Sequence, residues 1–184
     1  TAGAYRACEE RGACSPALLP LPSDDRLPAT GISWLQAQSY CRSLGRRLPS
    51  ENEWEAAARR AGRFPWGDAS PSCGLAVHGL RPGSPCAAEG AAVTPRAAPP
   101  ADQRDDGVLL DLAGNVWEFV DSEYSPERGL GSGGLTVAGQ SALRVIKGGA
   151  YTSGEEALRP GARIGVRTDY AAEDVGFRCA RDPG

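Results

Sequence analysis

Two helix starts of the same design follow each other early in the chain, and they constrain its fold more than any other feature. Ser33 is followed three residues later by Gln36, and Ser50 is followed three residues later by Glu53. A serine with Gln or Glu at this spacing is a capping box, because each side chain bonds the backbone N–H of the other residue. Apolar residues then recur at helical spacing until a glycine ends each pattern. The sequence therefore predicts two well-defined helices.

The rest of the chain is rich in glycine (24) and proline (15), with short periodic segments between long irregular ones. Residues 2–11 have the pattern of a short helix, and residues 144–151 and 175–180 have that of short strands. At 184 residues, we expect a single loop-rich domain over residues 1–184. The segments without sustained periodicity, which predict ordered loops, are residues 15–31, 69–107, 121–142 and 152–174.

Six cysteines and a single histidine weigh against a zinc site, because the chain has no CxxC pair and no Cys/His cluster. An even number of widely spaced cysteines is typical of disulfides formed in an oxidising compartment. We therefore expect a secreted, periplasmic or cell-surface protein. Two of the expected disulfides close short loops, and the third joins the first third of the chain to its end. The pairs are Cys8–Cys14, Cys73–Cys86 and Cys41–Cys179.

Charge and hydropathy narrow the range of partners. The net charge is −3 and the pI is about 5.3, which does not favour binding to nucleic acid or to an anionic membrane. No apolar run approaches the roughly 18 residues of a membrane-spanning helix. The chain begins at Thr1 within a predicted helix and carries no signal peptide, so we expect it to be part of a longer chain.

The stretch from Asp111 to Glu118 joins two carboxylates through a flexible Gly-Asn break. A turn at the break would bring the carboxylates toward each other. Carboxylate and backbone carbonyl oxygens are the ligands that Ca²⁺ prefers. A simple turn with two solvated acids explains the same residues, so local chemistry leaves both interpretations open. Trp117 and Phe119 alternate with Glu118, which predicts a strand with one buried face and one polar face.

Three glutamates, Glu51, Glu53 and Glu55, lie at the start of the second capped helix. They could form a catalytic carboxylate cluster. Carboxylates in the first turn of a helix also stabilise the positive end of its dipole. We favour this second interpretation.

Six motifs occur in a fixed order over nearly the whole chain. They are Ser33-Trp34-x-x-Ala37-x-x-Tyr40-Cys41, Arg47-Leu48-Pro49-Ser50-Glu51-x-Glu53-Trp54-Glu55-x-Ala57-Ala58-Arg59, Phe64-Pro65-Trp66-Gly67-Asp68, Gly114-Asn115-Val116-Trp117-Glu118, Gly148-Gly149-Ala150-Tyr151 and Gly176-Phe177-Arg178-Cys179. Together they resemble the formylglycine-generating enzyme (sulfatase-modifying factor) family. The resemblance implies an α+β fold, a variant of the C-type lectin fold with two main helices, small antiparallel sheets and much ordered coil. It also implies that the family's first strand is missing before Thr1 and that Cys41 pairs with Cys179.

The resemblance also implies a structural calcium site at the Gly-Asn break. In the family, the ion is held by the acidic or amide residue before the break, two backbone carbonyls and the final glutamate. In this chain these ligands are Asp111, Gly114, Val116 and Glu118. Local chemistry and the resemblance agree, so we expect bound Ca²⁺.

The resemblance does not extend to the residues that give the family its catalytic activity. The oxidases of the family bind copper(I) through two cysteines shortly after the Gly-Gly motif, and copper(I) selects such soft thiolates. Here the two positions hold Ser153 and Leu158. We therefore expect neither copper nor formylglycine-generating activity.

The resemblance favours a non-catalytic module that binds a protein or a small polar or anionic ligand. Arginines beside a tyrosine can bind carboxylates, phosphates, sugars or a protein partner. Two alternatives remain: an accessory domain of a larger bacterial enzyme or kinase, or a non-copper enzyme with Glu155 or Asp169 as its acid or base. The predicted ligand face consists of Ser153, Glu155, Glu156, Arg159, Arg163, Arg167, Asp169 and Tyr170.

Overall fold

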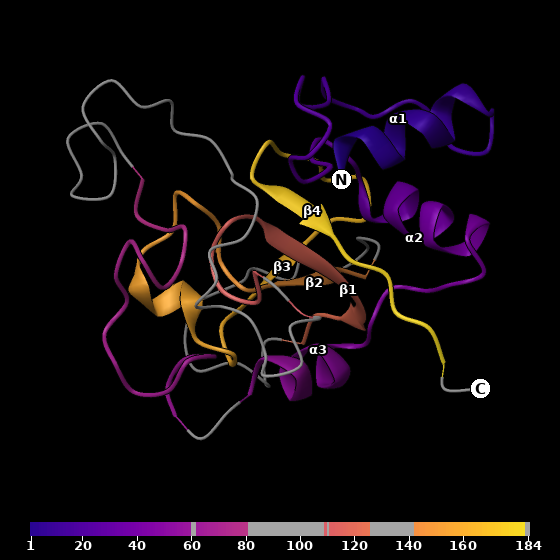
Figure 1. The fold of residues 1–184 in the computed structure, drawn as a ribbon. Coiled ribbons are helices and arrows are strands. Elements are labelled where there is room, and N and C mark those ends of the chain that lie inside the picture. Colours follow the sequence, from indigo (N-terminus) through magenta and orange to yellow (C-terminus); the bar gives the residue numbers. More distant parts are fainter. Residues whose placement is uncertain (60–61, 81–108, 110, 126–141, 183–184) are drawn as a thin grey trace.

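The computed structural model describes residues 1–59, 62–80, 109, 111–125 and 142–182 (Figure 1). Within these residues the chain forms three α-helices, a short 3-10 helix and a four-stranded sheet, which confirms the α+β class. The helices are α1 (Ala2–Glu10), α2 (Trp34–Ser43), α3 (Glu51–Ala58) and η3 (Glu155–Leu158). The strands are β1 (Trp117–Glu123), β2 (Arg144–Lys147), β3 (Arg163–Val166) and β4 (Val175–Phe177).

Both predicted capping boxes are present. The hydroxyl of Ser33 accepts a hydrogen bond from the backbone N–H of Gln36, whose side chain accepts one from the backbone N–H of Ser33. Ser50 and Glu53 make the same reciprocal pair at the start of α3. These bonds satisfy N–H groups that the first turn of a helix leaves without partners, so the two helices begin where the sequence predicts.

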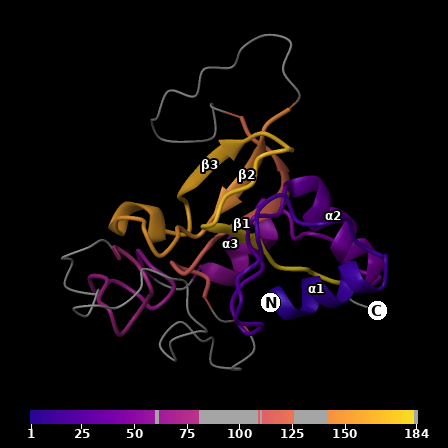
Figure 2. The same ribbon diagram turned by 90° about the horizontal axis from the view of Figure 1, so that it is seen from above.

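The sheet has the strand order β3-β2-β1-β4, and it is mixed rather than antiparallel. β2 runs antiparallel to both β1 and β3, whereas β4 pairs with β1 in parallel. The prediction of small antiparallel sheets was therefore wrong for β4, which lies on the opposite edge from β3. Figure 2 shows β3 beside β2, the strand with which it pairs. The predicted loop over residues 152–174 was also wrong in part, because it contains η3 and β3.

Neighbouring residues of β1 point to opposite faces of the sheet and reach separate apolar clusters. Phe119 packs in the cluster that includes Tyr5 of α1 and Trp34 of α2. Val120 packs in the cluster that includes Trp54 of α3. The sheet therefore lies between α1 and α2 on one face and α3 on the other, which agrees with the layers in Figure 1.

Two of the three predicted disulfides lie within the described residues and are formed. Cys8 bonds Cys14 within the first segment, and Cys41 of α2 bonds Cys179 after β4. Cys73 is disulfide-bonded as well, and its predicted partner Cys86 lies outside the described residues. In the part of the chain that the structure describes, no helix is long and apolar enough to cross a bilayer.

Candidate functional site

The turn before β1 contains three residues in the left-handed region of backbone space. Asp111 has φ 55°, Gly114 has φ 77° and Asn115 has φ 63°. A Cβ atom on Gly114 would lie 2.3 Å from the carbonyl oxygen of Val77, so this position requires glycine. Left-handed residues other than glycine cost roughly 1 kcal/mol or more each, which means that surrounding contacts hold the turn in shape.

Backbone hydrogen bonds tie this turn to the segment that carries the Gly-Gly motif. The N–H of Gly114 donates to the carbonyl of Gly148, and the N–H of Tyr151 donates to the carbonyl of Asn115, each at 2.8 Å. The N–H of Asn115 donates to Val77 at the same distance. The predicted calcium turn and the segment that leads to the family's copper positions therefore form one connected unit.

Glu118 does not lie on a polar, solvated face as its alternation with two aromatic residues predicted. Its side chain is 7% exposed, and Arg178 donates to both carboxylate oxygens at 2.6 Å. The indole N–H of Trp54 donates to one of the same oxygens at 2.6 Å. A buried carboxylate requires such charge-assisted partners. Strand alternation did not reveal them, because Trp54 and Arg178 lie 64 and 60 residues away along the chain.

Asp111 lies beside this pair and carries a perturbed carboxyl group. Its Oδ2 accepts a hydrogen bond from the side-chain amide of Asn115 at 3.1 Å, and Arg178 Nη2 donates to its backbone carbonyl at 3.3 Å. Its Oδ1 is buried and has no hydrogen-bond partner. Burial, followed by the nearby charge of Glu118, raises the pKa of Asp111 to about 7. The turn thus brings the two acids together, as its sequence suggests.

One carboxylate oxygen of this turn suits a hard cation. Asp111 Oδ1 is a buried carboxylate oxygen that no N–H or O–H group satisfies, and a calcium ion would satisfy it. A cation here would share the carboxylate of Glu118 with Arg178. No group of three or more His, Cys, Asp or Glu side chains within the described residues could hold a metal. A calcium ion at this turn would therefore depend on backbone carbonyls, such as the predicted ones of Gly114 and Val116.

The two positions of the family's copper cysteines do not fit copper. Ser153 Oγ accepts a hydrogen bond from the backbone N–H of Ala150 at 2.9 Å and so closes the turn after the Gly-Gly motif. Leu158 is fully buried and packs with Phe64 and Ala113. Copper(I) selects soft thiolates, and neither a hydroxyl nor an aliphatic side chain supplies one.

A buried network of ion pairs joins α3 to β2 and β3, and the sequence did not predict these contacts. Lys147, the only lysine in the sequence, is completely buried, and its Nζ lies 2.7 Å from Glu55 and 3.5 Å from Glu51. Arg163, whose side chain is 6% exposed, forms an ion pair with Glu51 at 2.9 Å. Two of the three glutamates that we assigned to the helix dipole thus neutralise cations from β2 and β3. The one available signal was the single lysine within a predicted strand.

This network removes Arg163 from the surface on which we predicted ligand binding. Four of the remaining charged members of the predicted face form local pairs. Arg159 pairs with Glu156 at 2.9 Å, and Arg167 pairs with Asp169 at 2.7 Å. The further members at the surface are Ser153, which is partly buried, Glu155 and Tyr170.

The comparison with protein families shows to which family the chain belongs. The family model of the sulfatase-modifying factor enzyme 1-like domain matches residues 5–183. The chain belongs to this family. This result confirms the resemblance on which the expected fold was based.

The relatives of the chain include a protein that is named inactive and one that is named as an enzyme without this qualifier. The chain is 37% identical over 169 residues to the inactive C-alpha-formylglycine-generating enzyme 2 of Mus musculus, with 86% of the chain and 50% of that protein covered. It is 36% identical over 169 residues to the formylglycine-generating enzyme of Streptomyces coelicolor, with 84% and 52% covered. The chain therefore spans about half the length of these curated relatives.

A solved structure supports the same fold. PvdO from Pseudomonas aeruginosa superimposes with a TM-score of 0.73 at 22% identity, with 100% of this chain and 77% of that chain covered. At this identity the likeness establishes the fold alone. Function in this sulfatase-modifying-factor domain has to be inferred from its own residues.

Proposed function

We propose that this domain is a non-catalytic module that binds a protein or a small polar or anionic ligand on the formylglycine-generating enzyme scaffold. The observation that carries the proposal is the loss of both thiolates after the Gly-Gly motif. Ser153 bonds the local backbone, and Leu158 is part of an apolar cluster, so both positions serve packing and turn formation. One relative that matches over 169 residues is itself named inactive, which supports the same conclusion.

A copper(I) titration tests the loss of the metal centre. The wild-type domain should show no tight one-to-one binding of copper(I) in competition with a chelator. The double variant Ser153→Cys/Leu158→Cys restores two thiols at these positions and should gain copper affinity. The matched control Ser153→Ala/Leu158→Ala should not. Tight stoichiometric binding by the wild type would refute the proposal.

For ligand binding we propose the surface that Arg159, Arg167, Asp169 and Tyr170 provide. The local ion pairs of the two arginines are solvent-exposed, so exchanging them for an incoming anion costs little. Arg163 is left out, because its pairing with Glu51 is buried. With inorganic phosphate as the probe, the NMR signals of the Arg159 and Arg167 side chains should shift, and that of Arg163 should stay unchanged.

We further propose that Ca²⁺ is bound structurally at Asp111, Gly114, Val116 and Glu118. The support is the unsatisfied, buried carboxylate oxygen of Asp111 within a turn of left-handed residues. When bound, the ion would neutralise two neighbouring carboxylates and add to the contacts that hold this turn in shape.

The disulfides favour a secreted, periplasmic or cell-surface location. The chain matches only half the length of its curated relatives, so a role as an accessory domain of a larger enzyme is the second candidate. The two candidates differ in whether the domain binds a ligand by itself. Binding of phosphate at Arg159 and Arg167 by the isolated domain favours the first candidate. Ligand binding that requires attached domains favours the second.

A further inference from the structure

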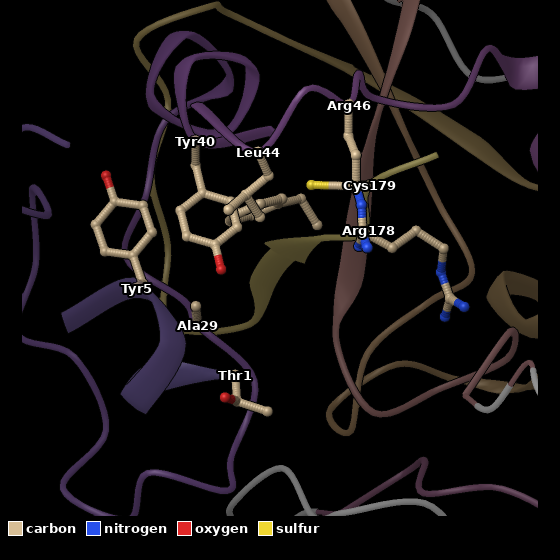
Figure 3. Close-up of a pocket in the computed structure, with 9 residues that line it drawn as sticks. Thr1, Tyr5, Ala29, Tyr40, Leu44, Arg46, Arg178 and Cys179 are labelled. Atoms are coloured by element: carbon tan, nitrogen blue, oxygen red, sulfur yellow. The ribbon is translucent and has the colours of Figure 1, made fainter. Parts of the chain in front are cut away.

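A pocket of about 270 Å³ lies where α1, α2 and the end of β4 meet (Figure 3). It shares no residue with the calcium turn, the Gly-Gly segment or the predicted ligand face. Arg178, which lines it, also donates to the backbone carbonyl of Asp111 in the turn. Its lining includes Tyr5 of α1, Tyr40 of α2 and Phe177 of β4. The volume lies just below the range of about 300–1,000 Å³ that is typical of small-molecule sites, so any ligand has the size of a single aromatic ring with one substituent.

Three aromatic rings make the walls of this pocket. The rings of Tyr5 and Tyr40 stack with their centroids 5.4 Å apart, and Phe177 meets Tyr40 edge-on at 5.4 Å. Tyr5 uses its hydroxyl to bond the carbonyl of Ser15, and in Figure 3 the hydroxyls of Tyr5 and Tyr40 point in opposite directions. The Cys41–Cys179 disulfide also borders the space and fixes α2 to the segment after β4. The three rings give the pocket flat aromatic surfaces that suit a planar group.

The charge of the pocket is positive, because its nine lining residues include two arginines and no acid. Arg178 is neutralised by Glu118. Arg46 is exposed, and its side chain has no ion pair or hydrogen bond with any residue of the described part of the chain. The neighbouring Arg47 binds both Glu53 and Asp182, so these two acids do not compensate Arg46. Figure 3 shows the Arg46 side chain running from the loop after α2 toward Cys179.

We propose that this pocket binds a small carboxylate with a planar apolar body. The ring of the ligand lies against Tyr40 and Phe177, and its carboxylate accepts hydrogen bonds from the guanidinium of Arg46. A planar guanidinium matches a carboxylate with two parallel bonds, which gives the site preference for an anion over a neutral analogue. The inference does not rest on the function proposed above.

Benzoate tests this site, with benzamide as a neutral analogue of nearly the same shape. A ligand of about nine non-hydrogen atoms should bind with a dissociation constant in the millimolar range. We expect benzoate to shift the ring signals of Tyr5, Tyr40 and Phe177 in NMR spectra of the whole chain. Benzamide should bind at least about tenfold more weakly, since it lacks the charge that pairs with Arg46.

Two arginine variants distinguish recognition of benzoate by Arg46 from a general effect of positive charge. Arg46→Gln should weaken benzoate binding at least about tenfold and abolish the difference between benzoate and benzamide. Arg42→Gln removes an exposed arginine from the last turn of α2, outside the pocket, and should leave the dissociation constant unchanged. Equal binding of the two probes to the wild type would overturn the proposal. So would ring signals that stay unshifted at high benzoate concentration, or full benzoate affinity in Arg46→Gln.

Discussion

Arg178 donates hydrogen bonds to both carboxylate oxygens of Glu118, each at 2.6 Å. The next residue, Cys179, is disulfide-bonded to Cys41 of α2. The chain after β4 is thus held to β1 by an ion pair and to the helical layer by a covalent bond. Because Arg178 also bonds the carbonyl of Asp111, the same side chain connects β4 to the proposed calcium turn.

Removal of Arg178 should destabilise the fold strongly. Arg178→Ala leaves the carboxylate of Glu118 buried without its counter-ion, and breaking a pair of this kind costs about 3–5 kcal/mol in the free energy of unfolding. Arg181→Ala, three residues further on and exposed, should change the stability by less than about 0.5 kcal/mol. Urea denaturation measures both values. Equal stability of the two variants would show that the pair contributes nothing.

The buried Lys147 should show strong coupling to Glu55. Lys147→Met removes the buried partner of Glu55 at 2.7 Å and leaves it only Arg59, a largely exposed partner at 3.0 Å, so we expect a loss of up to about 3 kcal/mol. Glu55→Leu leaves Lys147 buried with only the longer contact to Glu51 and should cost a similar amount. The double variant removes both charges and should lose much less than the sum. A double-mutant cycle from urea denaturation gives the coupling energy, and additive losses would argue against a buried pair.

Calcium removal should lower the thermal stability. A ligand present at about 100 times its dissociation constant stabilises the folded state by about 2.7 kcal/mol, so EDTA should reduce Tm by several degrees. Asp111→Ala should remove the response to EDTA, because it deletes the carboxylate proposed as a ligand. Glu155→Ala, an exposed acid outside the turn, should keep the response. An unchanged Tm of the wild type on chelation would count against the calcium site.

Acid should weaken the domain partly through Glu53. The hydrogen bonds from Arg47, followed by the bond from the backbone of Ser50, lower the pKa of Glu53 from 4.5 to about 2. Between these values the unfolded state binds more protons, so the stabilisation is complete above pH 4.5 and is lost as the pH falls toward 2. The carboxylate is half exposed, so the effect is modest.

A glutamine substitution isolates this contribution. Glu53→Gln should flatten the dependence of the unfolding free energy on pH in the acid range. The same substitution at Glu10, exposed at the end of α1, serves as the control. If the two variants and the wild type lose stability with the same slope, the pairing of Glu53 with Arg47 has no part in acid unfolding.

The sequence predicts the local elements of this fold better than its long-range contacts. Ser33 and Ser50 marked the helix starts, because a capping box is contained within four residues. β3 was missed, since its edge position leaves Ile164 exposed and Gly165 breaks the apolar alternation. The parallel pairing of β4 depends on the path of the whole chain, which no local pattern encodes.

In the candidate site, too, the local features could be predicted and the long-range contacts could not. The meeting of Asp111 and Glu118 follows from the Gly-Asn break between them, and the structure confirms it. The burial of Lys147 was missed, because lysine is rarely found fully buried and its partner Glu55 lies 92 residues away. Arg163 was assigned to a surface because its partner Glu51 also lies far away along the chain.

We propose that this domain has kept the scaffold of its family without the copper chemistry. The decisive experiment is incubation of the domain with copper(I), oxygen and a cysteine-containing peptide, followed by mass spectrometry of the peptide. With Ser153 and Leu158 in place of two thiolates, the peptide should keep its thiol mass, apart from peptide disulfide that forms equally without the protein. Repeated turnover of the peptide cysteine to an aldehyde would show that the domain is catalytic.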